Sequence, residues 1–253
     1  MTEDEWRSST DPWAMCDFIR TATTSWKTRW LGWMKAKRFQ VSDRKWRLIE
    51  LARLEKVARE GSFPQLDELL PSARLRAEGR LPPGEANWVA SAISSWLWQV
   101  NRRVPRLPPE GEYRACAAVA ALGWMFLPQL PMDLPHEEMV RDAEARARRL
   151  LDGNAMAPRR QALNADLADA VRDILGHLFV ADPIDPAWLA ANDGAARGLA
   201  VSMAASGDYR DMPVLADALE DAGCATEAVL SHCRQTTRHV RGCWVVDRLL
   251  GRE

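Results

Sequence analysis

Apolar residues along this chain recur mostly at intervals of three and four, the spacing that places them on one face of an α-helix. From Ser42 onward, for example, Trp46, Leu54 and Val57 fall on one stripe, and Gly61 ends the pattern. Alternating runs of Val, Ile, Thr and Tyr, which are typical of strands, are nearly absent. The pattern therefore predicts an all-α fold.

The same spacing recurs between prolines and glycines along the rest of the chain. Helices are predicted approximately over residues 11–20, 25–37, 42–60, 88–100, 112–127, 136–151, 163–174, 187–206, 212–222, 226–234 and 239–250. Four prolines interrupt residues 63–83, where we expect short helices and turns, and residues 177–186 should form a loop. We expect an irregular multi-helix array, with an N-terminal helical region at 1–180 and a compact C-terminal helical module at 181–253.

Composition is that of a globular protein, but charge is unevenly distributed. The 253 residues are 47% apolar and 27% charged, with a net charge of −1, so no global field attracts nucleic acid or anionic lipid. Residues 20–60 hold twelve Lys/Arg and four Asp/Glu, whereas residues 161–253 hold eight and fourteen. The two ends could attract each other, which is the simpler interpretation, or face different partners.

Several features favour a cytoplasmic location. The first five residues include three acidic ones and lack the basic start and apolar run of a signal peptide. The longest apolar stretch, Ala115 to Leu127, covers about 13 residues, whereas spanning a bilayer takes roughly 20. An odd number of cysteines, five, is typical of reduced thiols rather than of a disulfide framework.

Both ends of the chain resemble a paralogous family of uncharacterised bacterial proteins found chiefly in planctomycetes. At the start, the resemblance lies in MTEDEW (1–6), STDP (9–12) and SDRK (42–45). At the end, it lies in DPAWL (185–189), MPVLADALEDAGC (212–224), HCR (232–234) and HVRGCWVVD (239–247). This resemblance implies a bacterial origin and a helical module, and it implies no activity.

A cysteine and histidine cluster near the C-terminus is the sharpest chemical feature. Cys224, Cys233, His239 and Cys243 have the spacing C-x8-C-x5-H-x3-C, with His232 beside them. Thiolates and imidazoles are ligands that Zn²⁺ prefers, and four of them suit a closed structural site. The alternative is that these cysteines are buried core thiols on separate helices, and the sequence favours that alternative over zinc.

A basic segment rich in tryptophan is the second candidate. Trp26, Trp30 and Trp33 share one face of the helix predicted at 25–37. The cations around them are Lys27, Arg29, Lys35, Lys37, Arg38, Arg44, Lys45 and Arg47. Cations with stacking aromatics suit a single-stranded nucleic acid, and the same pattern suits a membrane surface. A helix that buries its tryptophans and solvates its charges is the favoured interpretation.

Catalytic signatures are missing from the sequence. It contains no G-x-x-x-x-G-K-[ST], G-x-G-x-x-G, G-x-S-x-G or H-E-x-x-H motif, and a Cys233–His239 nucleophile pair has no third orienting group. We therefore expect a non-enzymatic helical protein that binds a protein partner as an adaptor or accessory. The alternatives are a nucleic-acid-binding accessory protein that uses residues 26–47, and a small protein with a structural zinc site.

Overall fold

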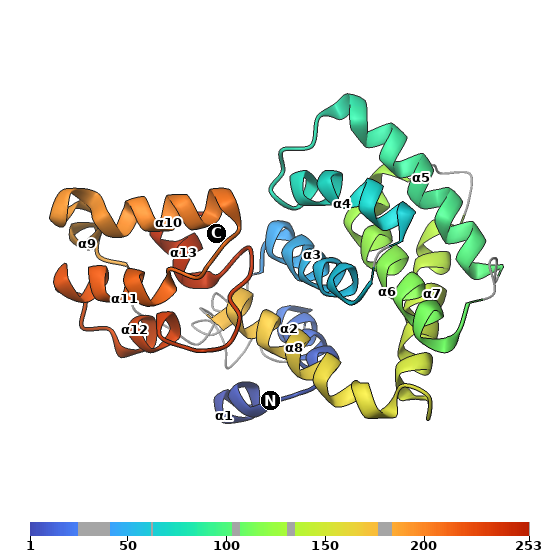
Figure 1. The fold of residues 1–253 in the computed structure, drawn as a ribbon, viewed down its shortest axis with the longest axis horizontal. Helices are drawn as coiled ribbons and strands as arrows, with labels where there is room; N and C mark the ends of the chain where they lie inside the picture. The colour runs from blue at the N-terminus through green and yellow to red at the C-terminus, as the bar shows by residue number, and fades with distance from the viewer. Residues whose placement is uncertain (25–40, 62, 103–106, 131–134, 177–183, 253) are drawn as a thin grey trace. The chain divides into compact units, whose positions relative to one another are not determined.

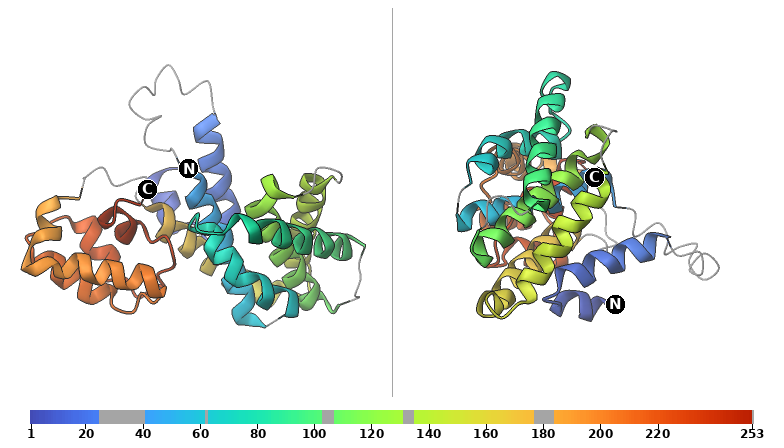
Figure 2. Two further views of the ribbon diagram at one scale, coloured as in Figure 1. Left: turned by 90° about the horizontal axis from the view of Figure 1, so that it is seen from above. Right: turned by 90° about the vertical axis from the view of Figure 1, so that its right-hand side faces the viewer.

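The computed structural model describes residues 1–24, 41–61, 63–102, 107–130, 135–176 and 184–252. Throughout these residues the chain forms helices joined by turns and loops, and none of them belongs to a strand (Figures 1 and 2). The predicted all-α class and the irregular multi-helix array are confirmed. In the same described residues, no helix is both long and apolar enough to cross a membrane.

The chain divides into two compact units that are not consecutive in sequence. Unit 1 combines both ends of the chain, Met1–Lys45 and Ala165–Glu253, and unit 2 is the intervening stretch Trp46–Asn164. Helices α3 and α8 contain the two points at which the chain passes from one unit to the other. The predicted domains, 1–180 and 181–253, stay a prediction.

Unit 2 is built around helix α6. Its elements are α3 (Asp43–Glu60, from Trp46), α4 (Pro64–Ala77), α5 (Pro83–Asn101), α6 (Pro109–Phe126), η3 (Leu127–Gln129), α7 (His136–Asp152) and the start of α8 (Ala157–Leu175). Helix α6 packs against α4, α5 and α7, and its residues from Ala115 to Gly123 are all buried. It is the central core element that its Ala-rich, apolar sequence predicts.

Helix α4 corrects the expectation of short helices and turns between residues 63 and 83. The chain forms one continuous helix from Pro64 through Pro71 to Ala77. Pro64 stands in the first turn, where its missing N–H is not needed. Pro71 lies within the helix, which tolerates it because Leu66 and Leu69 are buried on a face that packs against α5 and α6. Tertiary packing thus outweighs the local preference against proline.

Unit 1 contains the helices of both chain ends. They are α1 (Glu3–Ser8), α2 (Pro12–Thr24), α8 from Ala165, α9 (Pro186–Ala190), η5 (Asn192–Gly194), α10 (Ala195–Ser206), α11 (Met212–Asp221), α12 (Glu227–Cys233) and α13 (Trp244–Leu249). Helix α10 packs against α9, α11 and α13, and α12 packs against α11 and α13 (Figure 1). These five helices share one hydrophobic core, which includes Met203, Leu215, Leu219 and Val245.

The C-terminal helices differ from their predicted bounds at two places. The predicted helix 187–206 is split, because Asn192, Asp193 and Gly194 adopt φ values of 50°, 56° and 78°, a left-handed conformation that an α-helix cannot contain. The predicted helix 239–250 is reduced to α13, Trp244–Leu249. Residues before Trp244 form a loop instead, and this loop carries two of the candidate metal ligands.

Candidate metal centre

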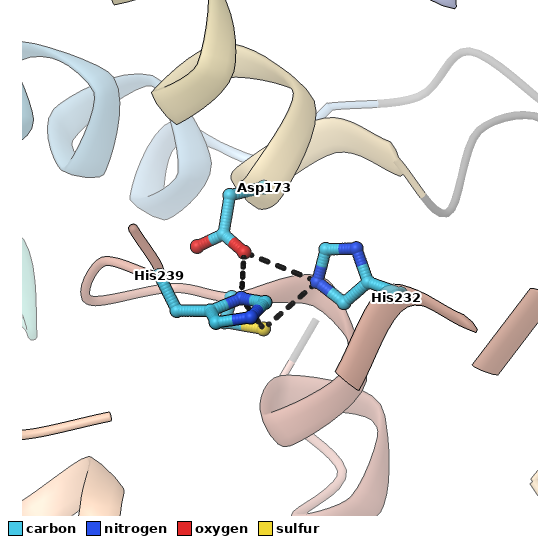
Figure 3. A group of neighbouring side chains, drawn as sticks. Asp173, His232 and His239 are labelled. Carbon is cyan, nitrogen blue, oxygen red and sulfur yellow. Dashed lines mark hydrogen bonds and ion pairs between the residues drawn. The ribbon is translucent and has the colours of Figure 1, made fainter. Parts of the chain in front are cut away.

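Four side chains of unit 1 converge on one point in its interior. Asp173, His232, His239 and Cys243 each offer one ligand atom, and these four atoms lie within 4.8 Å of one another (Figure 3). All four residues are buried, with relative exposures of 4%, 7%, 8% and 0%. Carboxylate, imidazole and thiolate are each established zinc ligands, so this cluster is a candidate site for a metal ion.

Separate elements position the four groups. Asp173 lies in the last turn of α8, and His232 lies in the last turn of α12. His239 belongs to the loop that follows α12, and Cys243 directly precedes α13. The loop is held from the other side by Arg241, whose guanidinium donates to the carbonyl oxygens of Ala204 and Ser206 at 3.2 Å and 3.1 Å. The site therefore joins α8 to the C-terminal helices.

In each of the two imidazoles, one nitrogen lies close to both Asp173 and Cys243. The Nε2 atom of His232 lies 3.1 Å from Oδ1 of Asp173 and 3.3 Å from Sγ of Cys243. The Nδ1 atom of His239 lies 2.6 Å from the same Oδ1 and 3.9 Å from the same Sγ. A single nitrogen carries at most one proton, so one imidazole nitrogen cannot donate a full hydrogen bond to oxygen and sulfur together. A cation at the centre would give all four atoms a partner at once.

The protonation states of Asp173 and Cys243 follow from their burial and from their close contacts. Burial alone would raise the pKa of Asp173, but hydrogen bonds from His232 and His239 lower it to about 2, so Asp173 is a carboxylate. Burial, and then the charge of Asp173, raises the pKa of Cys243 well above its ordinary value. Without a cation this sulfur is therefore a neutral thiol, and a bound metal ion is what would make it a thiolate.

Neighbouring groups fix the orientation of two of these side chains, Asp173 and His232. The second carboxylate oxygen of Asp173, Oδ2, accepts a hydrogen bond of 2.8 Å from the backbone N–H of Val240, which leaves Oδ1 for the centre. The imidazole of His232 packs against the indole of Trp244 at 5.0 Å between ring centroids. Such contacts orient ligands before an ion arrives.

Two of the four predicted metal ligands belong to this cluster and two do not. His239 and Cys243 are present, whereas Cys224 and Cys233 are replaced by Asp173 and His232. Cys224 and Cys233 are part of the hydrophobic core, as the alternative of buried thiols predicts. Burial, and then the neighbouring Cys224 and Asp173, raises the pKa of Cys233 to about 12, so it is a protonated thiol.

Helical geometry explains why His232, and not Cys233, belongs to the cluster. His232 and Cys233 are consecutive in α12, and consecutive residues point about 100° apart around a helix. When His232 faces the cluster, Cys233 faces the core. The sequence placed His232 beside the cluster, whereas Asp173, 66 residues before His239, gave no signal.

Most of the basic tryptophan-bearing segment lies outside the described residues. This applies to Trp26, Lys27, Arg29, Trp30, Trp33, Lys35, Lys37 and Arg38. Arg44 and Lys45 are described, and both contact Asp247: Arg44 Nη1 lies 2.7 Å and Lys45 Nζ 2.6 Å from its Oδ2. Lys45 is only 2% exposed, so its ammonium group pairs with Asp247 in the interior of unit 1 and is not presented on the surface. Arg47 belongs to unit 2, where its charge contributes to the lowered pKa of Arg76, although burial contributes more.

Comparison of the chain with protein-family models, with curated proteins and with solved structures gave no match.

Proposed function

We propose that this chain is a non-enzymatic helical protein whose unit 1 is held together by a structural metal ion, zinc, bound by Asp173, His232, His239 and Cys243. One observation carries the proposal: four donor atoms from four separate segments lie within 4.8 Å of one another in a buried place. The metal-ligand interpretation of the C-terminal cluster is kept, with two of its four residues replaced.

The donor set supports zinc in particular. Zn²⁺ accepts nitrogen, oxygen and sulfur ligands together, and its structural sites have four protein ligands in tetrahedral arrangement. With metal–ligand bonds of roughly 2.0–2.3 Å, the edges of such a tetrahedron measure roughly 3.3–3.8 Å. The distances from the two imidazole nitrogens to Oδ1 of Asp173 and Sγ of Cys243 are 2.6, 3.1, 3.3 and 3.9 Å, so one lies within that range, two lie below it and one lies above it.

A thiol nucleophile is less well supported by the same residues. In a Cys–His–Asp arrangement the acid and the thiol must contact opposite nitrogens of one imidazole, so that the acid orients the base. Here Asp173 and Cys243 contact the same nitrogen of His232. The raised pKa of Cys243 also opposes a reactive thiolate.

The decisive experiment is a metal analysis of the purified full-length chain. We expect about one equivalent of zinc per chain, since the cluster offers one closed set of four ligands. The variant Cys243→Ala should lose most of it, and Cys224→Ala, which removes a buried thiol outside the cluster, should keep it. Zinc below about 0.2 equivalents in the wild-type chain, or equal retention in both variants, would contradict the proposal.

A second candidate, the protein-interaction role predicted from the sequence, is favoured by two exposed tryptophans of unit 2. Trp88 and Trp98 are 48% and 46% exposed, and Ser91 and Ser95 lie between them on the same exposed face of α5. Exposed Trp is enriched at binding hot spots. This role is tested by affinity capture from a bacterial lysate after nuclease treatment: a partner that the wild-type chain retains and a Trp88→Ser, Trp98→Ser variant loses would support it. The nucleic-acid alternative stays a prediction, because most of its residues lie outside the described part of the chain.

A further inference from the structure

One face of helix α5 in unit 2 is exposed from its first turn to its last. Helices α4, α6 and α7 pack against α5 and bury its inner face (Figure 1). The outer face is exposed at Trp88, Ser91, Ser95, Trp98 and Arg102. Steps of three and four residues alternate between these positions, so they form one stripe along the helix. This alternation is the spacing of helices that pair side by side.

The stripe has the same pattern in both directions. Trp88 and Trp98 lie five residues before and after Ile93, and Ser91 and Ser95 lie two residues before and after it. Two antiparallel α5 helices that cross at the level of Ile93 therefore place each Trp88 opposite Trp98 of the second copy, and each Ser91 opposite Ser95. A two-fold symmetric interface uses the same patch on both copies, so it requires a patch that complements itself in this way.

The sizes of these side chains suit such a crossing. Small serines at the crossing point let two helices approach closely. The helices diverge on either side of that point, which leaves room for the larger indoles. Trp88 and Trp98 are 48% and 46% exposed, so most of the apolar surface that pairing would cover belongs to these two residues.

Charges at the two ends of the stripe are complementary as well. Glu85 lies in the first turn of α5, and Arg102 is the C-cap residue. Both are exposed, and they lie roughly 25 Å apart along the helix, too far to pair within one chain. The guanidinium of Arg102 lies 4.4 Å from the ring centroid of Trp98, so it is part of the stripe. In the antiparallel pair, Glu85 of each copy lies beside Arg102 of the other.

We propose that α5 is a dimerisation helix, through which two copies of this chain pair antiparallel by Trp88–Trp98 contacts and Glu85–Arg102 ion pairs at both ends. The inference rests on the protein-interaction role proposed for this face and names its partner, a second copy. One helix per copy makes a small interface, so the dimer should be weak, with a dissociation constant on the order of 10 µM.

The first test is sedimentation velocity of the purified full-length chain at total concentrations from about 1 µM to about 200 µM. We expect the average mass to rise from that of one chain toward that of two. Trp98→Ser should weaken association at least about tenfold, because each dimer loses an indole at both ends. Val214→Ser is the control: it removes an apolar side chain of unit 1 that is 52% exposed, and should leave association unchanged. The mass of a single chain at every concentration, or equal association of the two variants, would overturn the inference.

Charge reversal tests the antiparallel arrangement. Glu85→Arg and Arg102→Glu each place like charges together at both ends of the dimer, so neither variant should associate with itself. In an equal mixture of the two, every introduced charge meets an opposite charge on the other chain, and association should return. A mixture that stays as monomeric as its components would show that these ends do not meet.

This inference and the proposed functions fail separately. If the purified chain stays monomeric while a lysate protein is retained through Trp88 and Trp98, the interaction role stands and the second copy is the wrong partner. The metal proposal is independent of both outcomes, because α5 belongs to unit 2 and the metal ligands belong to unit 1.

Discussion

At the scale of single residues, Asp247 is a buried carboxylate of unit 1 that contacts two cationic side chains. Its side chain is 4% exposed and meets Arg44 at 2.7 Å and 3.2 Å and Lys45 at 2.6 Å. Lys45 Nζ also donates to the carbonyl oxygen of Gly242 at 2.9 Å. The first turn of α3 is thereby fixed to α13, within unit 1.

Replacing this carboxylate should be costly. We expect Asp247→Asn to lower the free energy of unfolding of unit 1 by about 3–5 kcal/mol, because the charge of Lys45 would stay buried without its counterion. Asp217→Asn is the control: Asp217 is exposed, and its contact with Arg234 should contribute little. Denaturant-dependent hydrogen exchange of the amides in α12 and α13 measures both, and similar losses in the two variants would contradict the prediction.

Glu144 in unit 2 links stability to pH. Burial by itself would raise the pKa of Glu144, but Arg53 and a hydrogen bond of 2.9 Å from the indole N–H of Trp124 bring it below its ordinary value of 4.5. A carboxyl whose folded-state pKa is depressed stabilises the fold above the unfolded value, and this contribution is lost as pH falls through the folded value. The acid sensitivity of unit 2 should therefore depend in part on Glu144.

The variant Glu144→Gln should be less stable than the wild type near neutral pH, and the difference should narrow as pH falls below 4.5. Urea denaturation at neutral and at acid pH measures this. Glu137→Gln serves as the control, because the Glu137 side chain is 57% exposed and its ion pair with Arg141 lies on the surface of α7. If the difference in free energy of unfolding between Glu144→Gln and the wild type stays constant with pH, the ionisation of Glu144 does not cause the acid sensitivity.

At the scale of elements, the closest helix packing in unit 2 depends on one glycine. A Cβ atom at Gly123 of α6 would overlap Cγ2 of Val140 in α7. Helices approach this closely only where a side chain is absent, so Gly123→Ala should destabilise unit 2 by about 1–3 kcal/mol.

A second substitution tests whether Val140 is the cause. In the background of Val140→Ala, which removes the overlapping methyl group, Gly123→Ala should cost clearly less, with a coupling of about 0.5–3 kcal/mol between the two sites. Gly84→Ala is a matched control in α5, because a Cβ there meets no atom within 4 Å. Thermal or urea unfolding measures all four variants, and additive effects at Gly123 and Val140 would show that the strain lies elsewhere.

At the scale of the whole molecule, the proposed metal ion belongs to only one of the two units. Removing it with a chelator should loosen α12, the loop that carries His239, and the end of α8, because these segments share its ligands. An ion present at about 100 times its dissociation constant contributes about 2.7 kcal/mol, which corresponds to roughly hundredfold faster amide exchange when it is lost. Exchange in α6 of unit 2 should stay unchanged.

Hydrogen exchange with mass spectrometry, before and after chelation, measures both units in one experiment. After chelation, the amides of unit 1 should exchange at the same rates in the wild-type chain and in Cys243→Ala. Equal loosening of α6 and α12, or no change in either while zinc is removed, would contradict a structural role confined to unit 1.

The sequence by itself determined the fold class and most helix positions. Helical periodicity and the stops at glycine and proline are local properties, so α3, α6 and α7 are readable from neighbouring residues. The sequence also indicated the local part of the candidate metal centre, since His239 and Cys243 lie four residues apart.

Only the tertiary structure decided which groups meet and which faces are covered. Asp173 joins the cluster from α8, 66 residues before His239, and nothing in the sequence between them fixes that distance. Trp96 and Trp98 lie two residues apart on α5, yet one is 5% and the other 46% exposed, because they point to opposite faces of the helix and, among the described residues, the helices of unit 2 cover only the face of Trp96. Periodicity predicts that a face exists, whereas burial of that face depends on segments distant in sequence.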